Sequence, residues 1–102
     1  MSDFKNTHNA LVSRILEGDG SASQAQRRSA FNNDGLDEPM RTLVSKVAEH
    51  PTNVNDEDFA AARASGLSED QIFEMVVSAA IGQATRQYNA ALAALDAATE
   101  RE

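Results

Sequence analysis

Two histidines are the residues of this chain whose side chains could move a proton near neutral pH. His8 falls on the apolar face of an expected helix, and His50 precedes Pro51 at the end of another. As acid–base groups they would serve a small decarboxylase, isomerase or hydrolase. The alternative is structural, because a histidine on an apolar face usually packs at the edge of a core, and a cation at a helix C-terminus interacts favourably with the dipole. We predict the structural role for both and assign no catalytic residue.

Carboxylates cluster at two places where a metal ion could be attracted. Residues 56–58 form one cluster, and Glu69, Asp70 and Glu74 form the other. Asp70 and Glu74 are four residues apart and therefore share a helix face. No histidine or further carboxylate completes a ligand set there, whereas carboxylates at a helix N-terminus are favoured by the dipole. The sequence therefore predicts helix capping at both clusters, with no metal and no cofactor.

Other kinds of site lack the residues that they need. The chain has no cysteine, which excludes disulfides, thiolate metal sites and thiol chemistry. The segment at residues 18–20 lacks the length and the lysine of a phosphate loop, and no serine lies in a nucleophile-elbow pattern. Arg27 and Arg28 could clamp an anion at a partner surface, but adjacent residues point to different helix faces. We expect both arginines to be solvated.

Length and charge limit the class of protein. A chain of 102 residues predicts one domain, residues 1–102. Sixteen acidic residues against nine basic ones give a net charge of −7, which argues against nucleic acid and anionic membrane as partners. No apolar run reaches membrane-spanning length, and the start has no signal-peptide pattern. The expected location is the cytoplasm.

The elements that must carry these residues are helices. No segment of useful length alternates apolar and polar residues, so we expect no strand. A first helix is expected over residues 3–17. A second begins at Ser23, which can form a capping box with Gln26, and it ends near residue 32 before a turn at residues 33–35.

A third helix carries the clearest amphipathic pattern in the chain. We expect Asp37 to cap it and Pro51 to stop it, because the residue before a proline resists helix. Its apolar positions recur at helical spacing and are Met40, Leu43, Val44, Val47 and Ala48. A short fourth helix is expected from an Asn55 cap to Gly66, a glycine suited to a left-handed C-terminal position.

The fifth expected helix runs over residues 68–98 and is the most apolar stretch of the sequence. Ser68 and Gln71 suit a capping box at its start. One apolar stripe runs along it and consists of Phe73, Val77, Ala80, Ala84, Tyr88, Ala91 and Leu95. We expect this stripe to face the core, with the Tyr88 ring buried. The helix would be about 45 Å long at 1.5 Å per residue, so it either bends near Gly82 or projects toward a partner.

A strip of small residues lies beside that stripe. Its members are Ser78, Gly82, Thr85 and Asn89. A glycine inside a helix costs about 1 kcal/mol relative to alanine, and the close approach of another helix can offset this cost. Few elements remain to cover Leu92 and Leu95. We therefore predict that the strip and these two leucines contact a second subunit of a symmetric homo-oligomer.

The stretch from Val54 to Leu95 resembles a known family. It contains VNDEDF at residues 54–59, SGLSEDQIFE at residues 65–74, and then an alanine-rich run that includes Arg86. These pieces resemble the carboxymuconolactone decarboxylase and alkylhydroperoxidase D-like family. With the helix that precedes them, the family-like part is residues 37–98, and residues 1–35 form additional N-terminal helices.

The resemblance implies a helical bundle that assembles into trimers, hexamers or similar rings. Activity in the family, where known, rests on a glutamate, a Cys-x-x-Cys pair and a histidine on one helix. This chain has no cysteine, so no catalytic residue carries over and thiol peroxidase activity is excluded.

The expectations combine into one fold and three functions. The fold is all-α, a small bundle of about five helices with a long C-terminal helix. The leading function is that of a catalytically inactive, oligomeric structural or protein-binding module. The alternatives are a small acid–base enzyme and a small-molecule binding protein with a pocket between helices.

Overall fold

The computed structural model describes the backbone of residues 2–100 and the side chains of residues 5–100. Five α-helices and one 3₁₀ turn follow one another along the chain: α1 (Ser2–Glu17), α2 (Gln24–Asn32), α3 (Met40–Glu49), η1 (Pro51–Asn53), α4 (Asp56–Ala64) and α5 (Glu69–Glu100). No strand occurs over residues 2–100. The all-α prediction with a long C-terminal helix is confirmed.

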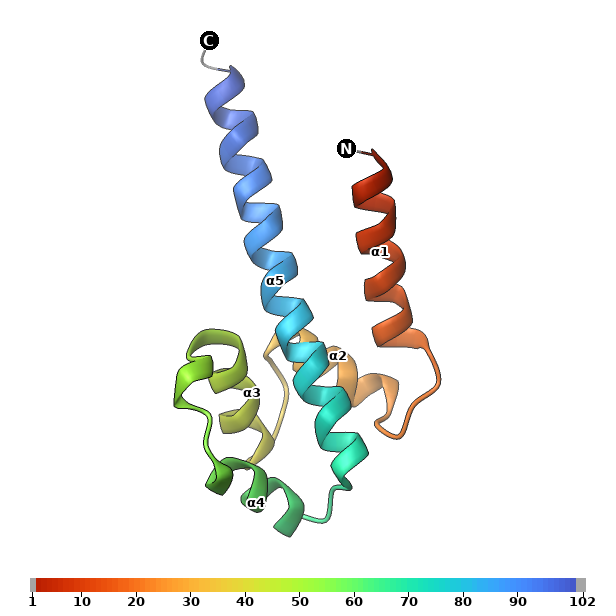
Figure 1. The fold of residues 1–102 in the computed structure, drawn as a ribbon, viewed down its shortest axis with the longest axis vertical. Coiled ribbons are helices and arrows are strands. Elements are labelled where there is room, and N and C mark those ends of the chain that lie inside the picture. Colours follow the sequence, from red (N-terminus) through yellow and green to blue (C-terminus); the bar gives the residue numbers. More distant parts are fainter. Residues whose placement is uncertain (1, 101–102) are drawn as a thin grey trace.

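The helices are arranged around α5. Helices α2, α3 and α4 gather about its first half, while α1 runs antiparallel to it and rises beside its second half (Figure 1). The Cα trace measures 55 × 29 × 20 Å, so the molecule is elongated along α5. α5 is uninterrupted through Gly82 and projects past the body. Within the described residues, no helix has the length and apolar character needed to cross a bilayer.

Three predicted helix caps are present, and each joins residues three apart in the chain. Reciprocal backbone-to-side-chain hydrogen bonds link Ser23 with Gln26, Asn55 with Asp58, and Ser68 with Gln71. Each pair satisfies two N–H groups that a helix start leaves without an intrahelical acceptor. Gly66 has a φ of 103°, as predicted for the position that ends α4.

The predicted cap at Asp37 is wrong. α3 begins at Met40, and Pro39 occupies the cap position with no side-chain cap bond. Asp37 is therefore two residues too early to cap the helix. The Glu38 carboxylate does related work, because it accepts the Thr42 backbone N–H at 2.9 Å and the Thr42 hydroxyl at 2.7 Å.

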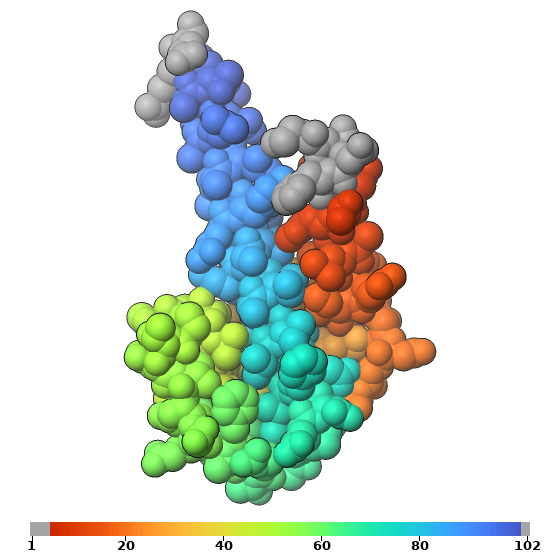
Figure 2. All heavy atoms as spheres, viewed as in Figure 1, coloured from red at the N-terminus to blue at the C-terminus, as the bar shows by residue number. Residues whose placement is uncertain are grey.

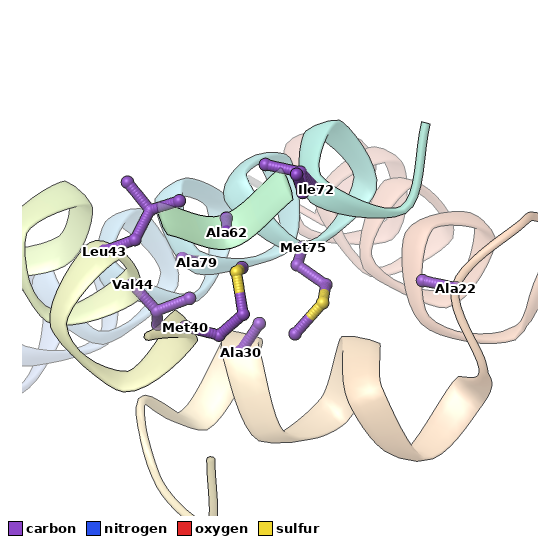
Figure 3. Close-up of a cluster of buried hydrophobic side chains, with 9 residues drawn as sticks. All are labelled: Ala22, Ala30, Met40, Leu43, Val44, Ala62, Ile72, Met75 and Ala79. Atoms are coloured by element: carbon purple, nitrogen blue, oxygen red, sulfur yellow. The ribbon is translucent and has the colours of Figure 1, made fainter. Parts of the chain in front are cut away.

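The hydrophobic core lies between α5 and the three short helices. Its fully covered members are Ala22, Ala30, Met40, Leu43, Val44, Ala62, Ile72, Met75 and Ala79 (Figure 3). Met75 of α5 and Ala30 of α2 point toward each other across this core (Figure 3). The core is thus built from α2, α3, α4 and α5, together with one residue of the α1–α2 loop.

The orientation of α5 about its axis differs from the prediction. Its buried positions are Ile72, Met75, Ser78, Ala79 and Gly82. The predicted core stripe is turned outward, and Phe73 and Leu95 are 67% and 58% exposed. Small residues face inward because α2 approaches α5 very closely. The Ser78 hydroxyl is satisfied inside the helix, since it donates to the Glu74 carbonyl at 2.8 Å.

Candidate functional site

His8 is a packing residue of the contact between α1 and α5. Its Nε2 atom lies 3.0 Å from the Thr85 hydroxyl oxygen. That hydroxyl already donates to the Ile81 carbonyl at 2.7 Å, and since a hydroxyl has a single donor, His8 Nε2 donates to it. The imidazole also stacks on the half-buried ring of Tyr88, with centroids 5.6 Å apart. These contacts tie α1 to the second half of α5.

His50 is exposed at the end of α3 and forms no site with His8. Its backbone N–H donates to the Lys46 carbonyl at 2.8 Å, which closes the last turn of α3. Helices α1 and α3 lie on opposite sides of α5 (Figure 1). The structure therefore does not bring the two histidines together.

The carboxylates of the two acidic clusters bind elements of the fold. Both Glu74 oxygens accept the Ser21 backbone N–H, at 2.9 and 2.8 Å, and one also accepts the Ala22 N–H at 3.1 Å. The Asp58 carboxylate lies 2.9 Å from Lys46 Nζ, and this bond, with one from the Asn55 N–H, lowers the pKa of Asp58. No cluster of three potential ligands for a metal ion occurs among the described residues.

Two arginines do structural work that sequence reasoning missed. Arg27, predicted to be solvated, is 5% exposed and donates from Nη1 to the Ile15 carbonyl at 2.9 Å. Arg28 is exposed, as predicted. Arg86 donates from Nη1 to the Phe31 carbonyl at 2.6 Å and so ties α5 to the last turn of α2. Its place one turn after Gly82, on the same face of α5, is the signal that could have suggested this contact.

The small-residue strip is largely covered by the chain itself. Ser78 and Gly82 are buried, and a Cβ atom on Gly82 would overlap the backbone of Phe31 in α2. The predicted contact of these two residues with a second subunit is replaced by one with α2 of the same chain, because the glycine lets the two backbones meet. Thr85 contacts His8.

The remaining predicted interface residues lie on the projecting part of α5. Asn89 is exposed, Leu92 is half-buried and Leu95 is 58% exposed. Figure 2 shows this part of the helix standing clear of the body, with α1 alongside. The prediction that these residues contact a partner therefore concerns a surface that is available for one.

The largest apolar surface on α5 is the outward stripe, called the α5 stripe below. It consists of Phe73, Val77, Ala80, Ala84, Tyr88, Ala91 and Leu95. Next to Phe73, an open cleft of about 270 Å³ lies between α4 and α5. This α4–α5 cleft is lined by Phe59, Arg63, Glu69, Ile72, Phe73 and Val76. Together, the stripe and the cleft form a surface that could hold an apolar partner.

In comparisons with protein-family models, with curated proteins and with solved structures, no match to the chain was found. The family resemblance of residues 54–95 therefore stays a prediction. The candidate site is defined by geometry alone, and it is the α5 stripe with the adjoining α4–α5 cleft.

Proposed function

We propose that this chain is a catalytically inactive helical module that acts by self-association through α5. The observation that carries the proposal is the exposure of Phe73 and Leu95, 67% and 58%, at the two ends of one continuous apolar stripe. A contiguous exposed apolar surface is typical of a protein-interaction site. A heterologous protein partner would use the same surface.

The proposal includes kinship with the carboxymuconolactone decarboxylase and alkylhydroperoxidase D-like family, as a cysteine-less relative. It is supported by where the quoted segments lie in the fold. VNDEDF spans the start of α4, and SGLSEDQIFE spans the turn at Gly66 and the first turns of α5. Helices thus begin where the resemblance implies them.

A second candidate function is the binding of a small apolar molecule. The α4–α5 cleft favours it, because its walls include the apolar side chains of Phe59, Ile72 and Val76. At about 270 Å³ the cleft lies just below the range of roughly 300–1,000 Å³ that is usual for ligand pockets. The acid–base enzyme has no comparable support, since the His8 ring is stacked on Tyr88 and bonded to Thr85.

Light scattering over a concentration series tests the proposal. The apparent mass should rise above the 11.0 kDa of one chain as concentration increases from micromolar to millimolar. The substitutions Phe73→Ser and Leu95→Ser should each weaken the association, because each removes an exposed apolar side chain from the stripe. Ala90→Ser is the control, since Ala90 is exposed on another face of α5. A mass that stays at that of one chain throughout would contradict self-association.

A further inference from the structure

The α5 stripe has the same spacing in both directions along the helix. Its middle residue is Ala84, and its other positions lie four, seven and eleven residues to either side. If two copies of α5 pack antiparallel about a twofold axis at Ala84, every stripe position meets a stripe position of the other copy. Such a face is complementary to itself, as an isologous interface requires.

We propose that a second copy of this chain docks on the α5 stripe in this antiparallel arrangement. The twofold axis passes Ala84, and Leu95 of each copy enters the α4–α5 cleft of the other. The inference rests on the proposed self-association and specifies its geometry.

The sizes of the side chains suit this register. Phe73 lies opposite Leu95, so the two most exposed apolar side chains of the helix meet. Ala80 lies opposite Tyr88, which pairs a small side chain with a large one. Ala84 meets its own copy on the axis, where two methyl groups let the helices come close. An antiparallel pair of this length fits the shallow crossing angle of about 20° that keeps long helices in contact.

The cleft and the leucine belong to opposite ends of the stripe. Leu95 is 22 positions beyond Phe73, which corresponds to about 33 Å along a helix. Leu95 therefore cannot reach the cleft of its own chain. The antiparallel arrangement brings it to the cleft of the other copy, between Phe59 and Ile72, and the symmetry fills both clefts at once.

The buried area predicts a dimer of modest affinity. A strip roughly 33 Å long and 10 Å wide covers roughly 330 Å² on each chain. Each filled cleft adds an area of the order of one aromatic side chain, about 150–250 Å². The total approaches, without exceeding, the lower bound of about 1,200 Å² for stable specific interfaces. The dimer should accordingly depend on concentration.

The charges around the stripe permit the pairing. None of the seven stripe residues is charged. In the proposed register Glu69 lies opposite Thr99, and Asp70 lies opposite Ala98, so no carboxylate faces another. Glu69 also has a partner in its own chain, Arg63 Nη1 at 3.8 Å. Each chain carries a net charge of −7, so salt should strengthen the dimer by screening the general repulsion.

The absence of native cysteine allows a direct test by single-cysteine cross-linking of the full chain. Helix axes about 8–10 Å apart, with Cα atoms about 2.3 Å from each axis, place the two residues at position 84 within reach of a disulfide. Under mild oxidation with diamide, Ala84→Cys should form a covalent dimer. The matched control is Ala90→Cys, an exposed alanine on another face.

A mixture of two variants tests the register separately. Phe73→Cys and Leu95→Cys, combined in equal amounts, should give a mixed covalent dimer, while each alone should cross-link no more than the Ala90→Cys control. Ala84→Glu places two carboxylates on the axis and should weaken the dimer at least tenfold with helix content unchanged, whereas Ala90→Glu should not.

The outcomes distinguish the geometry from the function. Self-association with cross-links at position 84 and between positions 73 and 95 supports the proposal. Self-association in which Ala84→Cys cross-links no faster than Ala90→Cys overturns this geometry but leaves the proposed function standing. A chain that is monomeric by light scattering at every concentration and salt level overturns both.

Discussion

The two halves of α5 are alike in composition and opposite in environment. Every residue of α5 that is buried lies between Ile72 and Gly82, and beyond Gly82 the described part of the helix has none. The first half meets α2, α3 and α4, whereas only α1 lies along the second (Figure 1). Burial along this helix therefore follows the supply of neighbouring elements and not the hydrophobicity of its residues.

The boundary between the halves coincides with the end of α2. The backbone of Phe31 meets α5 at Gly82, and Arg86 one turn later binds the Phe31 carbonyl at 2.6 Å. α2 ends at Asn32, and Asn33 has a left-handed φ of 52°. The chain then leaves α5, so from Arg86 onward α1 is the neighbour that remains.

The largest expected contrast between the halves is in the cost of removing a large apolar side chain. Met75 is 1% exposed in the first half, so Met75→Ala should lower the free energy of unfolding by about 2–5 kcal/mol. Leu95→Ala in the second half should change it by no more than about 0.5 kcal/mol in the monomer. Urea unfolding at low protein concentration measures both. Equal losses would show that the second half is covered within the chain.

The next contrast concerns added volume. Gly82→Ala gains about 1 kcal/mol of helix propensity, but the new methyl group overlaps the Phe31 backbone, and overpacking of this kind costs about 1–3 kcal/mol. We expect a net loss of up to about 2 kcal/mol by thermal or urea unfolding. Ala90→Leu, a larger addition at an exposed site of the second half, should be tolerated. A stabilised Gly82→Ala variant would mean that α2 does not approach α5 closely.

A smaller effect is expected from the contacts that hold α1 against the second half. His8→Gln removes a ring stacked on Tyr88 and disturbs a hydrogen bond to Thr85, which should cost about 1 kcal/mol. Amide hydrogen exchange should become faster in α1 while the core amides stay protected. His50→Gln, at an exposed position, is the comparison and should have little effect. Equal exchange profiles for the two variants would argue against a structural role for His8.

The smallest effect concerns the ion pair between α3 and α4, which support the first half of α5. Because Lys46 lowers the pKa of Asp58 in the folded state, the unfolded chain binds a proton there at a higher pH. The pair therefore stabilises the fold above the ordinary aspartate pKa of about 3.9, and this contribution is lost as pH falls through the lower folded pKa. Lys46→Met should lose less stability than the wild type on acidification below about pH 4. Lys5→Met, at an exposed lysine, should follow the wild type.

Features decided by residues close together in the chain could be predicted from the sequence. The capping boxes at Ser23, Asn55 and Ser68 each join residues three positions apart, so the same hydrogen bonds are available whatever the rest of the chain does. The left-handed Gly66 and the all-helical content follow for the same reason. The cap at Asp37 failed because a neighbouring carboxylate, Glu38, competed for Thr42.

Which face of α5 is buried was decided only by the tertiary structure. Periodicity identified an apolar stripe and a strip of small residues beside it, and the larger side chains suggested that the stripe faced the core. In the folded chain, α2 packs against Gly82 and Ser78, because only small side chains allow that close approach. The stripe from Phe73 to Leu95 is left outside, where its regular spacing becomes a surface. A helical pattern determines that two faces differ, but the shape of the neighbouring helices determines which one they cover.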